Sequence, residues 1–343
     1  RQFFPTPPAR PVASDPVYDR HARMFGDLGQ QRLRNLKVGI IGAGGGGSLL
    51  SQLLAHLGVG HLVVIDHDRV DLTNLPRIVG ATRWDARSIL TARRFAPLRR
   101  LGKRLATHKV RVAERVARSA QPGIRFDAVV GDIVDSATVA LIRDVDALFL
   151  ATDTMQSRLA FNSVVHQYLI PGFQIGAKVQ VDARTRQVES AFAVARPVLP
   201  YERGGCMLCN GLIPADRLQM EALTPAERAA QRYVDDEEVH EPSVITLNAM
   251  GAAQAANDLL MMVTELFEPE VELGGLMHQA REHTTLAIEP RTSPTCPDCG
   301  ATSRSRLARG DRRDLPCRIA TATPCSKRLF HNPLTRPAGR RGR

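Results

Sequence analysis

A glycine-rich turn near the start of the chain has the residue types and spacing that bind phosphate groups. Gly42, Gly44 and Gly47 form a G-x-G-x-x-G pattern between an apolar run, 37–41, and a segment with helical spacing, 48–57. Glycines let the backbone approach phosphate oxygens, and a helix N-terminus adds free N–H groups and partial positive charge. The pattern predicts a nucleotide site, although by itself it does not separate ATP from NAD.

Two C-x-x-C pairs indicate a metal site. Cys206 and Cys209 form the first pair, and Cys296 and Cys299 form the second. Four thiolates in this arrangement are typical of a tetrahedral Zn²⁺ site without an open position, which is structural rather than catalytic. A disulfide framework suits a secreted protein better, and a redox role suits one such pair better than two. Zinc would hold the segment that follows the helix expected at 243–266 against the sheet.

Both groups of residues need a scaffold, and the pattern of apolar runs predicts a parallel sheet. The second run, 61–66, ends on Asp66, about twenty residues beyond the glycines, where a carboxylate usually accepts from ribose hydroxyls. The expected class is α/β, with a Rossmann-type, mostly parallel sheet flanked by helices. Strands are expected over 37–41, 61–66, 124–130, 146–151, 173–181 and 188–195, and helices over 20–35, 48–57, 107–119 and 243–266.

The net charge of +11 raises the question of nucleic acid, so the location of the charge matters. Residues 301–343 carry 12 Lys or Arg against two Asp. Residues 82–105 carry eight against Asp85 alone. These two segments together carry more positive charge than the net charge of the whole chain, so the rest of the chain is not basic. Nucleic acid stays open as a partner.

Three parts are expected along the chain. Residues 1–19 form a flexible lead-in, residues 20–300 the nucleotide-binding domain with a basic insertion at 82–105, and residues 301–343 a disordered basic tail. Residues 214–240 are expected to be a mobile loop with one helix. Without an apolar run that could span a bilayer or a signal-peptide pattern, we expect a cytoplasmic protein and no membrane partner. Position 1 is not Met, which suggests a preceding segment.

The segment that follows the second strand resembles a known family. Residues 66–77 read D-H-D-R-V-D-L-T-N-L-P-R, similar to the D-x-D-x-V-x-x-S-N-L-x-R segment of E1-like (ThiF/MoeB/HesA) adenylating enzymes. Residues 20–30 resemble the family's N-terminal helix motif, 108–122 its P-K-V-x-x-A…N-P stretch, and 146–162 its D-x-V-x-D-C-T-D-N…R…N stretch. The ThiF and MoeB groups also carry the two C-x-x-C pairs. The resemblance covers residues 20–300 in order.

The resemblance implies that the chain binds ATP and joins the α-phosphate to a carboxylate. This reaction places negative charge on phosphorus and on the leaving pyrophosphate, which positioned cations stabilise. Arg77 and Lys109 would clamp the phosphates, and Asn74 would help to hold the triphosphate. Asp66 would accept from the ribose, with Asp68 beside it in the same nucleotide site.

Two further residues complete the site that the resemblance implies. Asp153 would position Mg²⁺, and Arg23 would reach the phosphates, in many relatives from the partner subunit of a dimer. We therefore expect a homodimer. Arg20 is a rival for the role of Arg23.

The sequence departs from the family pattern in three places. Ile78 stands where the family commonly has Gln, and Gly46 replaces the usual Leu of the glycine turn. Residues 82–105 look like an insertion before the phosphate lysine, which makes Lys103 a rival for that role. The matching flanks favour Lys109.

The carboxylate that the resemblance implies is the C-terminal glycine of a ubiquitin-like or sulfur-carrier protein. No cysteine lies between Asn210 and Ser243, where ubiquitin-activating relatives place their nucleophile. The reaction is therefore expected to stop at the acyl-adenylate or to pass the acyl group to another protein. Three alternatives stay open: adenylation of a small molecule or tRNA nucleoside, an NAD-dependent oxidoreductase, and a partner-binding scaffold without turnover.

Overall fold

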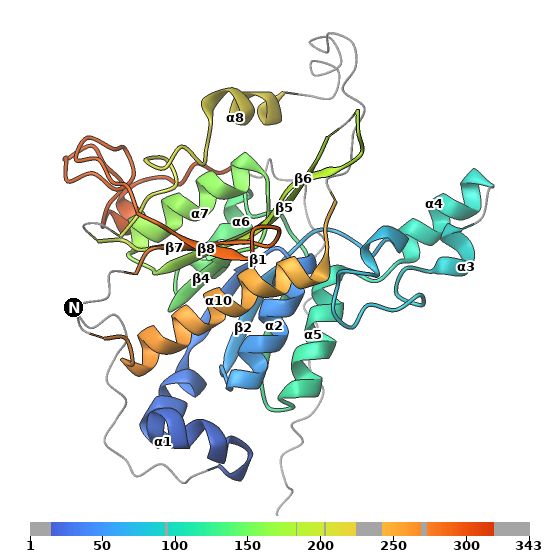
Figure 1. Ribbon diagram of the computed structural model, residues 1–343, viewed down its shortest axis with the longest axis horizontal. Coiled ribbons are helices and arrows are strands. Elements are labelled where there is room, and N and C mark those ends of the chain that lie inside the picture. The colour runs from blue at the N-terminus through green and yellow to red at the C-terminus, as the bar shows by residue number, and fades with distance from the viewer. Residues whose placement is uncertain are drawn as a thin grey trace, which may run out of the picture.

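The computed structural model describes residues 15–92, 95–182, 184–201, 204–223, 242–268 and 273–318. A single eight-stranded sheet runs through the molecule in the order β3-β2-β1-β4-β5-β6-β7-β8 (Figure 1). The strands pair in parallel from β3 to β5 and antiparallel from β5 to β8. They are β1 (Lys37–Ile41), β2 (His61–Ile65), β3 (Arg125–Val129), β4 (Ala147–Leu150), β5 (Gly172–Val181), β6 (Val188–Val198), β7 (Gly275–Gln279) and β8 (Thr284–Ile288).

Helices cover both faces of this sheet, which confirms the expected Rossmann-type architecture. On one face α2, α5 and α10 pack around Leu50, Val64 and Leu259. On the other face α7 packs on β4 and β5 through Phe161 and Val165. The helices are α1 (Asp19–Asn35), α2 (Gly45–Leu57), α3 (Ser88–Thr91), α4 (Ala96–Leu105), α5 (Lys109–Ala120), α6 (Ser136–Val139), α7 (Met155–Tyr168), α8 (Ala215–Ala222) and α10 (Ile245–Thr264).

The register of the parallel strands places their carboxyl ends at one edge of the sheet. Ile41 at the end of β1 pairs with Ile65 of β2 and with Leu150 of β4. The next residue, Gly42, donates its N–H to the Ile65 carbonyl at 2.8 Å, and Ala151 donates to Ile41 at 2.8 Å. Three segments that are far apart in the sequence therefore leave the sheet side by side, as ligand sites in such sheets require.

Two expectations of disorder need correction where the structure describes the chain. Residues 301–318 are packed against α7 and hydrogen-bonded to it, because their arginine and backbone groups find buried partners. Within the expected lead-in, residues 15–18 include the turn η1 (Pro16–Tyr18), and Tyr18 is buried. Residues 1–14, 224–241 and 319–343 lie outside the described residues. Among the residues described, no helix has the length and apolar character needed to cross a bilayer.

Candidate functional site

The glycine turn joins β1 to α2, and its geometry explains the glycines. Gly42 has a left-handed φ of 95°, and a Cβ at Gly47 would lie 1.8 Å from the Gly42 carbonyl oxygen. At Gly44, by contrast, a Cβ would meet no described atom within 4 Å, so the middle of the turn faces open space. Because α2 begins at Gly45 without a side-chain cap from the described residues, its first N–H groups can bind a phosphate.

Asp66 ties this turn to the loop after β2. One of its oxygens accepts from the N–H of Ala43 at 2.7 Å, and the other accepts from the N–H of Asp68 at 2.7 Å. Asp68 in turn lies 2.7 Å from Lys109 Nζ. Burial would raise the pKa of Asp68, but the hydrogen bond and charge of Lys109 outweigh it and lower that pKa. The Lys109 side chain is 11% exposed here, whereas that of Lys103 is 63% exposed.

The segment after this loop places two more predicted residues near the turn. Asn74 is buried, and its side-chain oxygen accepts from the N–H of Asp71 at 3.2 Å. Arg77 is half-buried, and its carbonyl oxygen lies 3.5 Å from the position of a Cβ at Gly45. Asn74 therefore shapes its own loop, and Arg77 adjoins the start of α2.

The end of β4 forms the other wall of the site. A Cβ at Gly42 would lie 2.7 Å from Thr152 Cγ2, so this segment touches the glycine turn, and the next residue, Asp153, is exposed at the same edge. Just beyond, Glu221 of α8 accepts from the first two N–H groups of α7 at 2.8 and 3.0 Å. Sequence patterns did not reveal Glu221, which fastens α8 to the border of the candidate nucleotide site.

Arg23 is the predicted site residue that the structure does not bring to the glycine turn. Its side chain is exposed and pairs within α1 with Asp19 at 2.9 Å. α1 contacts the far end of α10 near Val263, whereas the glycine turn contacts the start of α10 at Asn248. At 1.5 Å per residue these two ends are roughly 20 Å apart. In Figure 1, α1 lies at the bottom of the molecule and the pair α3 and α4 at the right.

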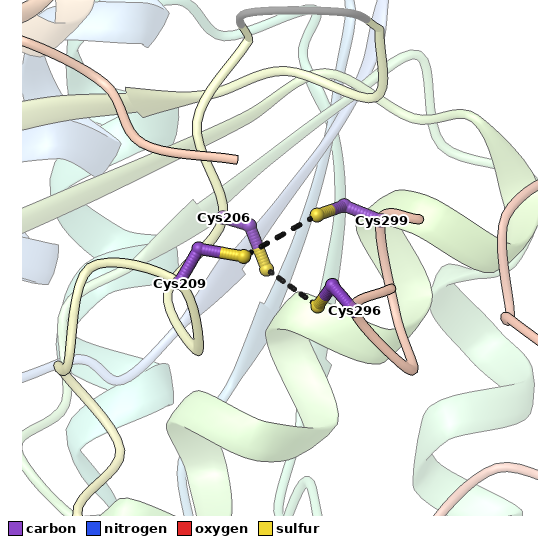
Figure 2. A group of neighbouring side chains, drawn as sticks. All are labelled: Cys206, Cys209, Cys296 and Cys299. Carbon is purple, nitrogen blue, oxygen red and sulfur yellow. Dashed lines mark hydrogen bonds between the residues drawn. The ribbon is translucent and has the colours of Figure 1, made fainter. Parts of the chain in front are cut away.

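The four predicted cysteines come together beside α7 (Figure 2). Their sulfur atoms all lie within 4.8 Å of one another, with Cys206 3.9 Å from Cys296 and Cys209 3.6 Å from Cys299. Sulfur atoms around a tetrahedral zinc ion lie roughly 3.8 Å apart, so this arrangement fits the metal. Contact with its neighbours and burial raise the pKa of the Cys206 thiol to about 11. A bound cation would therefore be needed to hold the group as thiolates.

Asn162 on α7 contacts both cysteine pairs. It is fully buried, and its Oδ1 accepts from the N–H of Met207 at 2.9 Å. Its Nδ2 donates to Asp298 Oδ2 at 2.7 Å and lies 3.5 Å from Cys206 Sγ. A primary amide suits this position because it offers both donors and an acceptor. Although Asn162 stands in a recognised motif, its role as a link between the metal site and α7 emerges only from the fold.

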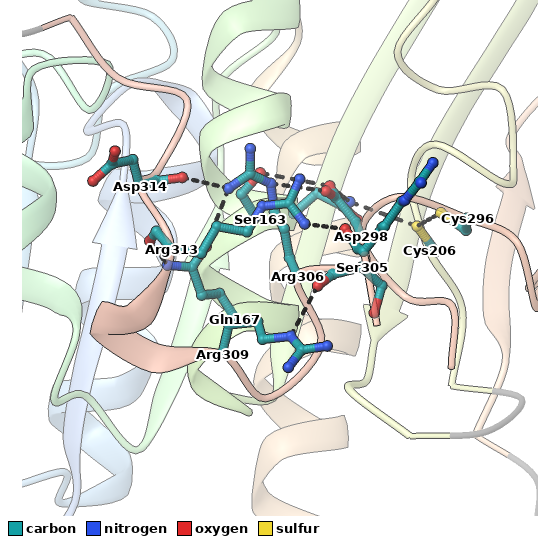
Figure 3. Close-up of polar contacts among 12 residues, drawn as sticks. Ser163, Gln167, Cys206, Cys296, Asp298, Ser305, Arg306, Arg309, Arg313 and Asp314 are labelled. Carbon is teal, nitrogen blue, oxygen red and sulfur yellow. Dashed lines mark hydrogen bonds and ion pairs between the residues drawn. The ribbon is translucent and has the colours of Figure 1, made fainter. Parts of the chain in front are cut away.

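Residues 301–318, which we name the clasp, extend the metal site along α7 (Figure 3). Arg306 Nε lies 3.1 Å from Asp298 Oδ1, and both side chains are largely buried. Gln167 of α7 donates to the carbonyl of Gly310 at 2.7 Å. Burial raises the pKa of Asp298, while its hydrogen bond from Asn162 and the charge of Arg306 oppose that rise. The clasp is thus joined to the second cysteine pair by a buried ion pair.

Known proteins are similar to this chain in sequence or in fold. The model of the ThiF family matches residues 18–301. The sulfur carrier protein adenylyltransferase of Thermus thermophilus is 26% identical over 289 residues, which cover 82% of this chain and 90% of the relative. The SAMP-activating enzyme E1 of Haloferax volcanii is 27% identical over 285 residues, 82% of this chain and 88% of the relative.

A solved structure of E. coli MccB with AMPCPP and MccA has a similar fold. It superimposes with a TM-score of 0.60 at 20% identity, over 84% of this chain and 75% of that one. At this identity the likeness concerns the architecture alone.

Proposed function

Because this chain belongs to the ThiF family of E1-like adenylyltransferases, we propose that it activates the C-terminal carboxylate of a small ubiquitin-like or sulfur-carrier protein. ATP supplies the adenylyl group and Mg²⁺ accompanies it. A carboxylate oxygen of the carrier forms a bond to the α-phosphorus, the bond from that phosphorus to the bridging oxygen breaks, and pyrophosphate leaves. The acyl-adenylate then awaits a nucleophile on another molecule.

One observation carries this proposal: the glycine turn, the 66–77 loop and the end of β4 meet at one edge of the sheet. In the proposed site the triphosphate lies over the open side of Gly44, where the N–H groups of α2 face its oxygens. Lys109, held in place by Asp68, neutralises the charge that develops on the phosphates. Asp153, exposed at the same edge, would hold Mg²⁺, which would supply positive charge toward the leaving pyrophosphate.

We propose a homodimer as the complete enzyme. Arg23 lies on α1, which contacts the end of α10 near Val263, roughly 20 Å along that helix from the residue that the glycine turn contacts. A second copy can present its own Arg23 to that turn. Mixing Arg23→Ala chains with Lys109→Ala chains should restore part of the ATP-dependent activity that each lacks alone, and failure to restore any would oppose the dimeric site.

The nucleotide proposal is tested by calorimetric titration of the full chain with Mg·ATP and, separately, with NAD. We expect ATP to bind and NAD to give no heat. Lys109→Ala should weaken ATP binding by about tenfold or more, because a charge-assisted contact with phosphate is lost. Lys103→Ala is the matched control and should bind ATP as the wild type does. Binding of NAD alone would instead identify a dehydrogenase.

The carrier part of the proposal needs a second experiment. The chain is incubated with Mg·ATP and a diglycine-ended sulfur-carrier protein, and pyrophosphate and the AMP adduct are measured. Pyrophosphate release that requires the carrier's terminal carboxylate supports the proposal. ATP binding without adduct on any such carrier, but with adduct on a small carboxylic acid, would move the substrate to the small-molecule class.

A further inference from the structure

The described residues of the basic insertion, 82–92 and 95–105, include α3 and α4, a helical hairpin that projects from the body beside α5 (Figure 1). It is held at its base, where Asp85 pairs with Arg115 at 2.8 Å. The two helices touch at Gly102, whose added Cβ would lie 2.8 Å from Leu90 Cβ. Beyond that contact nearly every side chain of α4 is exposed. The hairpin is therefore a ridge with a large free surface.

Large apolar side chains are concentrated on this ridge. Of the eighteen that are exposed in the described chain, six lie within residues 84–105. Leu98, Leu101 and Leu105 are spaced by three and four residues, so they share one face of α4. Trp84 at the base is 71% exposed. Isolated exposed leucines need no explanation, but a contiguous apolar stripe on a projecting helix marks an interaction site.

The opposite face of α4 is strongly basic. Arg99, Arg100, Lys103 and Arg104 are all exposed, and α4 contains no acidic residue. A helix with Leu on one face and Lys or Arg on the other matches an in-plane membrane helix, whose apolar face enters the headgroup region while the basic side chains reach anionic lipids.

We propose that the α3–α4 hairpin docks on an anionic phospholipid bilayer. Nucleic acid would use the basic residues and would stack on Trp84, but it would leave the leucine stripe of α4 without a role. A second copy docking through the same face would bring together two α4 helices, each with four basic residues and no acidic one, which repel each other. An anionic bilayer can contact both faces, because the leucines enter the headgroup region and the basic side chains reach the anionic lipids. Such docking places the hairpin on the bilayer surface and requires no helix that spans the membrane. It does not depend on the proposed adenylation.

Trp84 is the only tryptophan in the chain, so its fluorescence reports on the hairpin without a label. The full chain is mixed with vesicles of phosphatidylcholine and phosphatidylglycerol in equal parts, or of phosphatidylcholine alone. With the anionic vesicles we expect co-sedimentation, a blue-shifted emission and quenching by bromine-labelled lipid acyl chains. Neutral vesicles should bind at least about tenfold more weakly, because the attraction between basic residues and anionic lipids is lost.

Two substitutions of the same kind separate the hairpin from the rest of the surface. Leu101→Glu should weaken binding to anionic vesicles by about tenfold or more, because a carboxylate replaces an inserted apolar side chain. Leu141→Glu is the matched control, since both leucines are 46% exposed, and it should bind as the wild type does. ATP titration of Leu101→Glu should be unchanged, which separates this inference from the nucleotide site.

Three results would overturn the proposal. They are no binding to anionic vesicles, equal binding by Leu101→Glu and the wild type, and equal weakening by Leu141→Glu. A further pattern would identify the hairpin as a polyanion site. In that pattern Arg99→Glu weakens vesicle binding while Leu101→Glu does not, and tRNA displaces the wild type and Leu101→Glu from vesicles equally well. The bilayer would then not be its partner.

Discussion

Two basic segments of this chain have similar compositions but pack differently in the fold. The α3–α4 hairpin at 82–105 projects from the body, whereas the clasp at 301–318 lies along α7. Each depends on a buried aspartate paired with an arginine. In the hairpin, Asp85 sits at the base and Arg115 comes from α5. In the clasp, Arg306 lies within the segment and reaches Asp298 beside the cysteines.

The difference shows that arginine content does not decide whether a segment packs against the body; access to buried acceptors does. Arg306 and Gln167 connect the middle of the clasp to the second cysteine pair and to α7. The arginines of α4 face away from every such acceptor and stay exposed. Buried pairs cost much to break, while exposed charges contribute little. Four predictions test this contrast, beginning with the largest effect.

Removal of zinc should release the clasp and spare the hairpin. The purified chain should carry about one zinc ion, and a strong chelator should remove several kcal/mol of stability, because zinc binding is coupled to folding of its ligand loops. Hydrogen exchange measured by mass spectrometry should rise sharply in 301–318 and stay unchanged in 82–105. Full protection of the clasp after chelation would show that its contacts with α7 suffice without the metal.

Arg306→Ala should be the most damaging single substitution in either basic segment. It leaves the buried Asp298 carboxylate without its cation, at a cost of about 3 kcal/mol in the free energy of unfolding. Arg104→Ala on α4 is the control and should change that free energy by less than about 0.5 kcal/mol. Urea unfolding of both variants measures the contrast, and equal effects would refute it.

Asp85→Asn should weaken the base of the hairpin in a pH-dependent way. Burial alone would raise the pKa of Asp85, but hydrogen bonds from Arg115 and Thr82 lower it to about 2. Because the pKa of Asp85 is lower in the folded protein than the value near 3.9 in the unfolded chain, its charge stabilises the fold at pH values above about 3.9. This stability is lost as the pH falls through about 2. The free energy of unfolding of Asp85→Asn should be about 2 kcal/mol below that of the wild type at pH 7, and this difference should decrease toward pH 2.

Urea unfolding at pH 7 and at pH 3 measures the Asp85 effect. A gap that stays constant with pH would show that the carboxylate charge of Asp85 does not contribute.

Leu101→Glu should have the smallest effect, leaving the free energy of unfolding within about 0.5 kcal/mol of the wild type. The leucine is exposed on a ridge, so the fold loses no packing. Thermal unfolding of Leu101→Glu beside Leu141→Glu checks this. A large loss from Leu101→Glu alone would mean that the stripe supports the fold and is not a free surface.

Much of the nucleotide half could be predicted because its signals are local. The glycine spacing, the apolar runs of β1 and β2 and the carboxylate at Asp66 lie within thirty residues, and strand order then brings Thr152 beside Gly42. The two cysteine pairs were equally visible, since their spacing reflects the metal's tetrahedral geometry. The roles of Arg77, Lys109 and Asp153 remain predictions, now with positions at one edge of the sheet.

Other elements escaped prediction for physical reasons. α7 is buried on most sides and carries polar residues such as Asn162 and Gln167 in its interior, so it lacks an amphipathic period. β7 and β8 are short strands of an edge hairpin, in which His278, Gln279, Thr284 and Thr285 interrupt the apolar pattern, and pairing with β6 joins the hairpin to the sheet. Both elements depend on partners distant in sequence.

The sequence by itself determined the chemistry available at each position: phosphate-binding glycines, a carboxylate after β2, cations in a family order and four thiols in two pairs. Only the tertiary structure decided which charges became buried partners. Asp298 and Arg306 meet because the second cysteine pair is folded against α7, and Arg99 and Arg104 stay in solvent because α4 projects from the body. An ion pair depends on distance and burial, and composition or spacing specifies neither, even for Asp298 and Arg306, which lie eight positions apart in the chain.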